Sequence, residues 1–301
     1  MSEMTGNILF TIVIPTYNRA HIIGATIESV LKQTYRNYEV IVVDDGSTDD
    51  TEKVIQQYGD SRLRYFKRDR QERSIARNFG TQQSKGQYIN WFDSDDIMLP
   101  NHLEELAAII KKYNSPALIG VAYEVERPDE GIVYQLKFPG PVLNPYMIRY
   151  NFLLTMTGIV RRDVALKYPF NSNAIPREDH ELWLRIATEY QVIANNTVTV
   201  RIIEHDQSGS VITGNKANVY ISELDAFIHE ISINPSVQQL LNGNMSRFKM
   251  YRYAASAYYF ASRGYKRPAL RLLSKSLRSH PLILFRKEFY AVVKNIIFTH
   301  S

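Results

Sequence analysis

The sequence of 301 residues contains no cysteine and no long apolar run. Without cysteine, disulfide bonds and thiolate metal sites are excluded, so any metal must be held by carboxylates, histidine, phosphate or water. No segment approaches the roughly 20 apolar residues of a membrane-spanning helix, and residues 1–7 lack the features of a secretory signal. We therefore expect a cytoplasmic protein, either soluble or peripheral on the inner face of the plasma membrane.

Charge is unevenly distributed along the chain. Of its 36 basic and 31 acidic residues, 12 basic residues but only one acid, Glu288, lie in 246–301. The preceding residues therefore carry a net negative charge, although the whole chain has a formal charge of +5. Partners of the basic tail are expected to be anionic. Apolar residues make up 45% of the chain, which is enough for a full globular core.

Apolar runs of strand length alternate with segments of helical period over the first two thirds of the chain. We expect strands at 8–14, 38–43, 62–67, 88–92, 117–125, 131–137 and 191–203, and helices at 21–33, 50–58, 73–84, 101–113 and 179–190. This alternation predicts an α/β fold with a mostly parallel sheet covered by helices on both faces. The polar segment 206–215 marks a boundary, which divides the chain into a domain over 1–212 and a basic helical region over 213–301.

Acidic residues gather where two of the predicted strands end. Asp44 and Asp45 follow one strand, and Asp93, Asp95 and Asp96 follow another. In parallel sheets, ligands bind at the carboxyl ends of the strands. Three carboxylates within four residues repel one another, and a hard cation such as Mg²⁺ or Mn²⁺, shared with a substrate phosphate, would offset that repulsion. The alternative is an acidic turn that precedes the next helix.

Four segments, each at a strand end or a helix start, complete this picture. They are Val13–Arg19 (VIPTYNR), Val43–Asp49 (VDDGSTD), Ala76–Gly80 (ARNFG) and Phe92–Asp95 (FDSD). Together they resemble the family 2 glycosyltransferases with the GT-A fold, over about residues 8–210. The resemblance implies a Rossmann-like domain that transfers a sugar with inversion from a nucleoside diphosphate sugar, by default a UDP-sugar. The acceptor would be a hydroxyl of a saccharide or of a lipid-linked molecule in cell-surface glycan synthesis.

The resemblance also implies which residues bind the donor. They are Pro15, Thr16, Tyr17, Asn18, Arg19, Asp44, Asp45, Arg73, Arg77, Asn78, Asp93 and Ser94. The Tyr17 ring would stack on the base, and the Asp45 carboxylate would accept a hydrogen bond from a base N–H. Core packing is the alternative interpretation of Tyr17. At Glu72-Arg73-Ser74 the sequence departs from the small residues usual in the family, so an exposed Arg–Glu pair is the alternative there.

Catalytic and metal-binding residues follow from the same resemblance. Asp93, Asp95 and His205 would hold a divalent cation, Mn²⁺ or Mg²⁺. Asp179 would be the general base that deprotonates the acceptor hydroxyl, with Glu178 as the fallback. The alternatives are an acidic helix N-terminus, which complements the helix dipole, and a solvated loop histidine.

Two other functions are compatible with the sequence. A nucleotidyltransferase shares a related sheet, but it generally carries a glycine-rich loop after the first strand, where this chain reads Pro15–Arg19 without glycine. A nucleotide-sugar-binding protein without transferase activity would keep the same acids. Processive relatives carry membrane helices and a Gln-x-x-Arg-Trp motif, and this sequence shows neither, so we expect addition of a single sugar.

The C-terminal region is expected to be helical. Small and apolar residues at 254–277 suggest a helical hairpin, and residues 282–298 place an apolar stripe beside Arg286, Lys287 and Lys294. Such a helix would either lie on an anionic membrane or dock on the first domain. Nucleic acid is not expected as a partner, because no recognised binding motif accompanies the basic charge.

Overall fold

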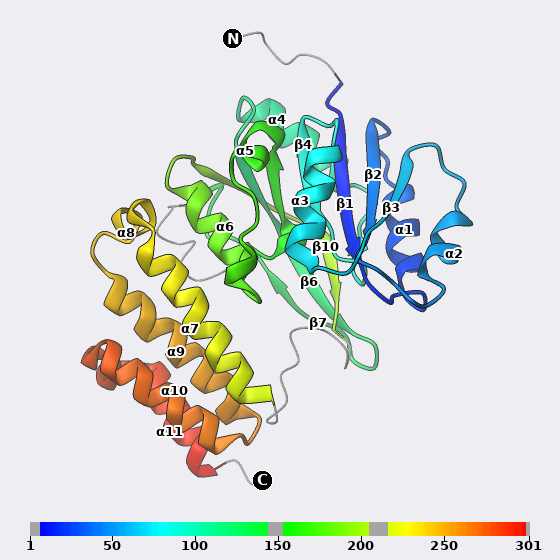
Figure 1. Cartoon of the computed structure of the whole chain (residues 1–301). Coiled ribbons are helices and arrows are strands. Elements are labelled where there is room, and N and C mark those ends of the chain that lie inside the picture. The colour runs from blue at the N-terminus through cyan, green and yellow to red at the C-terminus, as the bar shows by residue number, and fades with distance from the viewer. Residues whose placement is uncertain (1–6, 144–152, 205–215, 299–301) are drawn as a thin grey trace. The chain divides into compact units, whose positions relative to one another are not determined.

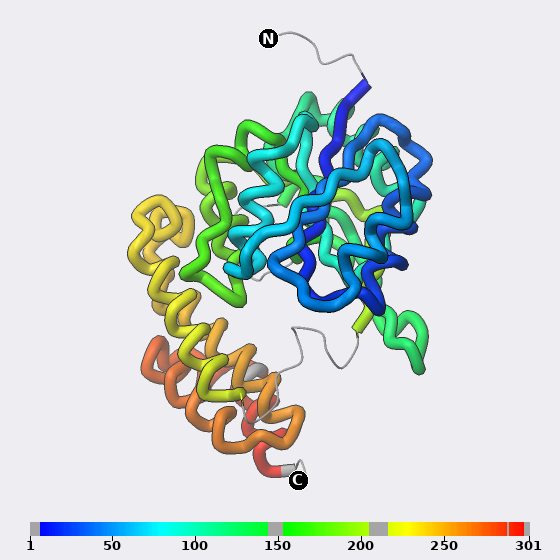
Figure 2. Tube along the Cα trace, turned by 45° about the vertical axis from the view of Figure 1, so that its right-hand side comes forward, coloured from blue at the N-terminus to red at the C-terminus, as the bar shows by residue number. Residues whose placement is uncertain are grey.

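A computed structural model describes residues 7–143, 153–204 and 216–298. The chain divides into two compact units. The first, which we call the sheet unit, comprises residues 1–172 and 178–206; the second, the helical unit, comprises residues 173–177 and 207–301. In Figures 1 and 2 the sheet unit runs from blue to green, and the helices of the helical unit run from yellow to red.

Within the described residues, the sheet unit is built on one ten-stranded sheet. Its strands are β1 (Phe10–Thr16), β2 (Tyr38–Asp44), β3 (Leu63–Lys67), β4 (Tyr88–Trp91), β5 (Ile97–Met98), β6 (Leu118–Arg127), β7 (Gly131–Leu136), β8 (Val142–Leu143), β9 (Gly158–Arg161) and β10 (Val192–Ile203). Eight of them are ordered β3-β2-β1-β4-β9-β6-β10-β5, while β7 pairs with β6 and β8 pairs with β10. Because β9 is antiparallel to both of its neighbours, β3, β2, β1, β4, β6 and β10 all run in the same direction. The predicted mostly parallel sheet is therefore confirmed, with antiparallel strands added to it.

Helices cover both faces of this sheet, as Figure 1 shows. They are α1 (Ile23–Leu31), α2 (Thr51–Gln56), α3 (Arg73–Gln83), α4 (His102–Lys112), α5 (Arg162–Lys167) and α6 (Glu178–Ala187). Side chains of α1 and α4 share one hydrophobic cluster with Ile12 and Ile14 of β1. Val13, which points to the opposite face, lies against α3, where a Cβ added to Gly80 would stand 2.3 Å from Val13 Cγ1. Glycine therefore permits α3 to approach the sheet closely.

Strand β1 extends further than the sequence predicted. It was expected to stop before Pro15, but Pro15 and Thr16 still pair with β2. Pairing with β4 ends at Val13. A strand tolerates proline where its N–H would face an unpaired edge, and Pro15 stands beyond the last β4 partner. The loop that follows β1 therefore starts at Tyr17.

The helical unit consists of α7 (Ala217–Ile233), α8 (Pro235–Leu240), α9 (Met245–Ser262), α10 (Lys266–Ser279), a 3₁₀ turn (Pro281–Phe285) and α11 (Lys287–Phe298). One expectation for its last segment was wrong, because the continuous helix predicted at 282–298 is broken by extended backbone at Arg286. Part of the apolar stripe is used within the unit, where Ile283 and Phe289 pack with Met250 and Ala254 of α9. Within the described ranges, no helix has the length and apolarity needed to cross a bilayer.

Candidate active site

The loops that follow β1 and β2 are tied together by hydrogen bonds. Ser47 Oγ accepts from the N–H of Asn18 at 2.9 Å, and Asn18 Oδ1 accepts from the N–H of Thr48 at 2.8 Å. The N–H of Arg19 donates to Thr51 Oγ1 at 2.9 Å. Asn18 has a φ of 51°, a left-handed conformation that asparagine adopts more readily than most residues. The Asn18 side chain therefore shapes this loop, although it was predicted to contact the donor.

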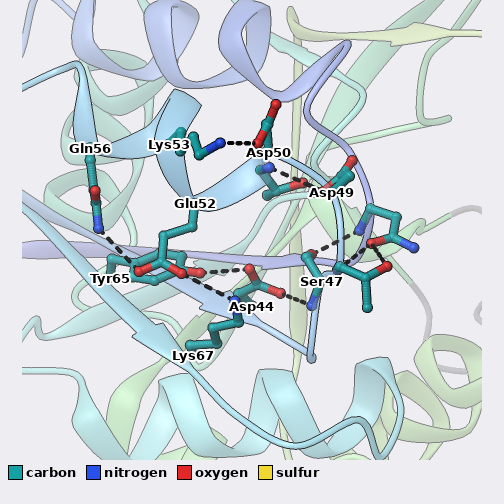
Figure 3. Close-up of polar contacts among 12 residues, drawn as sticks. Asp44, Ser47, Asp49, Asp50, Glu52, Lys53, Gln56, Tyr65 and Lys67 are labelled. Atoms are coloured by element: carbon teal, nitrogen blue, oxygen red, sulfur yellow. Dashed lines mark hydrogen bonds and ion pairs between the residues drawn. The ribbon is translucent and has the colours of Figure 1, made fainter.

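Asp44 is fully buried at the end of β2, and both of its carboxylate oxygens are engaged (Figure 3). Its Oδ1 accepts from the N–H of Ser47 at 2.7 Å, and its Oδ2 accepts from the Tyr65 hydroxyl at 2.6 Å. Burial, followed by the hydrogen bond to Asp44, raises the pKa of Tyr65, which keeps its hydroxyl protonated. Oδ1 of the neighbouring Asp45 accepts from the N–H of Gln71 at 2.9 Å. Asp44 thus closes the turn, while Asp45 ties it to the loop before α3.

The guanidinium of Arg70 lies over the ring of Tyr17. Arg70 Cζ lies 4.0 Å from the ring centroid, and Arg70 Nη1 donates to the Tyr17 hydroxyl at 2.7 Å. Next to it in the chain, Thr16 Oγ1 is buried and has no hydrogen-bond partner among the described residues. Such an atom is costly to leave unpaired, as expected where a ligand completes the site. Arg70 was missed by the sequence reasoning; the run of basic residues at 67–73 was the available signal.

Arg77 of α3 bridges two carboxylates that come from distant segments. Its Nη1 donates to Glu178 Oε1 at 2.8 Å, and its Nη2 donates to Asp93 Oδ1 at 2.7 Å. Arg73, one helical turn earlier, binds the same Glu178 through Nε at 2.5 Å and Nη2 at 3.2 Å. The side chains of Arg77 and Glu178 are each only 3% exposed, so their attraction is weakly screened. Helix α3 therefore connects the end of β4 with the first turn of α6.

The two adjacent acids Glu178 and Asp179 have pKa values that shift in opposite directions. Burial alone would raise the pKa of Glu178, but the Arg73 and Arg77 guanidiniums outweigh that effect and lower it. Burial, together with the negative charge of Glu178, raises the pKa of Asp179 to about 6. Asp179 Oδ1 also accepts from the N–H of His180 at 2.6 Å. Because a general base works best with a pKa near the operating pH, Asp179 is the stronger candidate of the two.

The three acids after β4 are directed at different partners. Asp93 pairs with α3 as described above, and Asp95 Oδ2 lies 3.4 Å from Arg19 Nη2. Asp96 is buried and accepts from the N–H of Ile203 at 3.1 Å. Burial, followed by the charges of Asp93 and Asp95, raises the pKa of Asp96 well above its usual value. Arginines distant in the sequence, Arg19 beside Asp95 and Arg77 beside Asp93, thus supply positive charge to these acids, so their repulsion alone does not require a cation.

Asp93 and Asp95 are nevertheless suited to contact a cation. Their side chains are 29% and 18% exposed, and carboxylate oxygens are ligands that Mn²⁺ and Mg²⁺ accept alongside phosphate and water. Among the described residues, no three Asp, Glu or His side chains are grouped so as to hold one metal. His205, the third predicted ligand, lies outside the described residues. The donor set fits a cation that takes most of its ligands from diphosphate and water.

Asn78 and Ser94 are two further residues that were predicted to bind the donor. Asn78 Nδ2 donates to the carbonyl of Phe170 at 3.0 Å, and Asn78 Oδ1 accepts from the N–H of Phe170 at 2.8 Å. Both halves of the Asn78 amide are thus used on one stretch of backbone, which favours a supporting role. Ser94 is buried between Asp93 and Asp95 in the chain.

The family model described as glycosyl transferase family 2 matches residues 11–167, more than half of the chain. The chain belongs to glycosyl transferase family 2. One relative is the UDP-Glc:alpha-D-GlcNAc-diphosphoundecaprenol beta-1,3-glucosyltransferase WfgD of Escherichia coli, which is 35% identical over 193 residues, or 62% of this chain and 73% of WfgD. An uncharacterized glycosyltransferase of Rickettsia bellii is 30% identical over 213 residues, which is 67% of this chain but only 31% of that relative. The chain therefore spans less than a third of the Rickettsia protein's length.

Solved structures share the fold of this chain over nearly its whole length. S. aureus TarS 1–349 in complex with UDP-GlcNAc aligns with a TM-score of 0.64 at 19% identity, covering 95% of this chain and 88% of TarS. Mannosyltransferase PcManGT from Pyrobaculum calidifontis, in complex with GDP-Man and Mn²⁺, aligns with a TM-score of 0.58 at 17% identity, covering 98% and 89%. At these identities the likeness establishes the fold. The predicted GT-A fold with a C-terminal helical region is confirmed, and a nucleotidyltransferase is not favoured.

Proposed function

We propose that this family 2 glycosyltransferase transfers a sugar, with inversion, from a UDP-sugar to a hydroxyl of a lipid-linked saccharide. The observation that carries the proposal is the Arg77 bridge between Asp93 and Glu178, since Glu178 is the residue next to the proposed base Asp179. The substrates are suggested by WfgD and by WfaP, two UDP-Glc:alpha-D-GlcNAc-diphosphoundecaprenol beta-1,3-glucosyltransferases that are 35% and 32% identical to this chain. UDP-glucose is therefore the first donor to test.

The donor would lie across the carboxyl ends of β1, β2 and β4. Tyr17 would offer a stacking face for the base, and Asp45 would accept from a base N–H. Arg70, which already covers Tyr17, would hold the base or the diphosphate. Asp93 and Asp95 would hold a divalent cation, which supplies Lewis-acid neutralisation of the charge on the departing diphosphate.

Asp179 would act on the acceptor side of the anomeric carbon. As the acceptor oxygen forms its bond to that carbon, its proton passes to the Asp179 carboxylate, and the bond to the diphosphate oxygen breaks with its electron pair. Glu178 cannot easily take this proton, because two arginines stabilise its charged form. Its negative charge instead helps to keep the pKa of Asp179 high enough for the task.

A mixed apolar and basic face of the helical unit would hold the enzyme near lipid-linked acceptors. Phe285 is 81% exposed, and Tyr290 and Ile297 on α11 are each 61% exposed. Lys287 and Lys294 are exposed on the same side of α11, since 287, 290, 294 and 297 recur at helical spacing. Large apolar groups interspersed with lysine suit the interface of an anionic bilayer.

Transfer can be tested with purified protein, Mn²⁺ or Mg²⁺, a synthetic GlcNAc-diphospho-lipid and a panel of UDP-glucose, UDP-GlcNAc, UDP-galactose and GDP-mannose. We expect UDP release and a lipid product one hexose heavier with a UDP-sugar. Asp179→Asn should abolish product formation, whereas Asp163→Asn, a matched change in the first turn of α5, should not. Failure of every donor, or full activity of Asp179→Asn, would remove the proposal.

Membrane attachment is a separate measurement. The protein should sediment with vesicles that contain phosphatidylglycerol more than with pure phosphatidylcholine vesicles. Phe285→Ser combined with Lys294→Glu should reduce that binding at least tenfold. Lys32→Glu, an equal charge change at an exposed position of α1's C-terminal end, is the control and should leave binding unchanged. Equal sedimentation with both lipids would contradict this part of the proposal.

A further inference from the structure

The helical unit contains a segment that is separated from its helices in the sequence. Residues 173–177 belong to it, although α6 of the sheet unit begins at the next residue, Glu178. Ala174 is fully buried, and its carbonyl accepts from the N–H of Arg177 at 2.8 Å. The residue that precedes the two acids of the site is thus held by a part of the chain that carries no predicted donor or catalytic residue.

Arg177 contacts Tyr220 of α7, and Tyr220 in turn contacts side chains of α9. Its Nη2 donates to the Tyr220 hydroxyl, and its Cζ lies 5.3 Å from the centroid of the Tyr220 ring. The Tyr220 oxygen is also 3.0 Å from Ser256 Oγ, and its ring meets the edge of Phe260 at 5.4 Å. Since arginine has only donors, the Tyr220 oxygen accepts from Arg177 and its own hydrogen is available to Ser256. Tyr220 is 8% exposed, so this arrangement is shielded from water.

We propose that Arg177 is a positioning residue for Asp179 and that the helical unit thereby fixes the general base. The inference rests on the proposed transferase function. Glu178 is clamped by Arg73 and Arg77 within the sheet unit, and Arg177 is clamped by Tyr220 within the helical unit. Anchors on consecutive residues restrict the backbone at the start of α6, and Asp179 follows directly.

The geometry of proton transfer makes this restriction matter. A general base must lie within hydrogen-bond reach of the hydroxyl that it deprotonates. A displacement of about 1 Å, even one caused far from the reacting atoms, can lower the rate on the order of 100-fold. Donor binding relies on other loops, so loss of the Arg177 anchor should lower kcat and leave the KM for the donor almost unchanged.

Two tyrosine variants form a matched pair for the test. Tyr220→Phe removes the hydroxyl that Arg177 binds. Tyr253→Phe removes a hydroxyl in the same unit that donates to Asp225 at 2.7 Å, and both tyrosines are 8% exposed. With UDP-glucose and the GlcNAc-diphospho-lipid, we expect Tyr220→Phe to lower kcat about 10-fold or more, with the donor KM within about twofold. Tyr253→Phe should match the wild type, and an equal fall in both variants, or no fall in Tyr220→Phe, would overturn the inference.

A second readout does not depend on turnover. Amide hydrogen exchange over 178–181 should accelerate in Tyr220→Phe, and exchange in α3 should not change in either variant. Unchanged exchange at 178–181 would overturn the inference, whether or not the wild type transfers sugar. A wild-type protein that transfers no sugar would count against the proposed function alone. Arg177→Lys, which keeps one donor for Tyr220, should retain more activity and protection than Arg177→Met. Equal losses in these two variants would also contradict a positioning role.

Discussion

Replacing Arg77 with methionine should lower the free energy of unfolding of the sheet unit by about 3 kcal/mol. Methionine retains apolar volume but removes the guanidinium that lies between Glu178 and Asp93. Removal of one partner from a buried ion pair destabilises a protein by about 3–5 kcal/mol, because the other charge is left uncompensated. The lower end applies here, since Glu178 keeps its contact with Arg73, and Asp93, with 29% of its side chain exposed, can be hydrated.

Urea unfolding followed by tryptophan fluorescence is suited to this measurement. The two tryptophans of the chain, Trp91 and Trp183, are both buried in the sheet unit, so the signal reports on the unit that the substitution affects. Arg73→Met is the comparison, because the Arg73 side chain is 42% exposed and its loss should be worth less than about 1 kcal/mol. A change of under 1 kcal/mol in Arg77→Met as well would refute the reasoning.

The double variant identifies the cause of the loss. If Arg77→Met destabilises the fold because Glu178 is left with too little positive charge around it, then adding Glu178→Gln should restore part of the stability. Coupling of this kind between contacting residues is typically 0.5–3 kcal/mol in size. Additive losses from the two substitutions would show instead that Arg77 acts through packing alone.

Three further predictions follow from the same geometry. The transfer rate should fall as the pH drops below about 6, because Asp179 must be deprotonated to act as a base. Glu178→Gln removes the negative charge beside Asp179 and lowers its pKa, so the acidic limb of the pH–rate profile should move to lower pH. Asn78→Ala should lower stability by about 1–2 kcal/mol in urea unfolding, through two lost backbone hydrogen bonds, while a raised KM for UDP-glucose at unchanged stability would reveal a donor contact instead. Gly80→Ala, whose Cβ would stand 2.3 Å from a β1 side chain, should cost about 1–3 kcal/mol, whereas Gly140→Ala, with no atom within 4 Å, should leave the thermal unfolding midpoint unchanged.

Periodicity predicted the larger elements of the fold well. The strand expected at 38–43 is β2 (Tyr38–Asp44), and the helix expected at 73–84 is α3 (Arg73–Gln83). The two-residue β5 and the four-residue β9 were missed, because a run that short has no period to detect. β9 exists through its pairing with β4 and β6, which are distant in the sequence. Tertiary contacts define such strands, and a single sequence does not display them.

The acids that follow β2 and β4 were predictable because a strand end fixes their place on the sheet, whereas Glu178 and Asp179, at the start of α6, came from the family resemblance. The positive partners of these acids were not predictable. Arg77 lies 101 residues from Glu178, and Arg19 comes from the loop after β1, far along the chain from Asp95. Among their sequence neighbours these acids have too few positive partners, which is why a metal was expected to supply the missing charge. The folded chain supplies much of it from arginines, so a metal must be argued from exposed carboxylates and from the diphosphate that shares it.

Adjacent acids acquire different tasks because a helix turns about 100° per residue. At the start of α6, Glu178 faces the two arginines of α3, and the following side chain is rotated away from them. Both arginines make short contacts with Glu178, whereas they influence the pKa of Asp179 less than burial and the charge of Glu178 do. One carboxylate is therefore held ionised as an anchor while its neighbour is left able to accept a proton. The dipeptide Glu-Asp does not by itself indicate which acid is the ionised anchor and which is the proton acceptor. The direction in which the arginines of α3 point determines both roles.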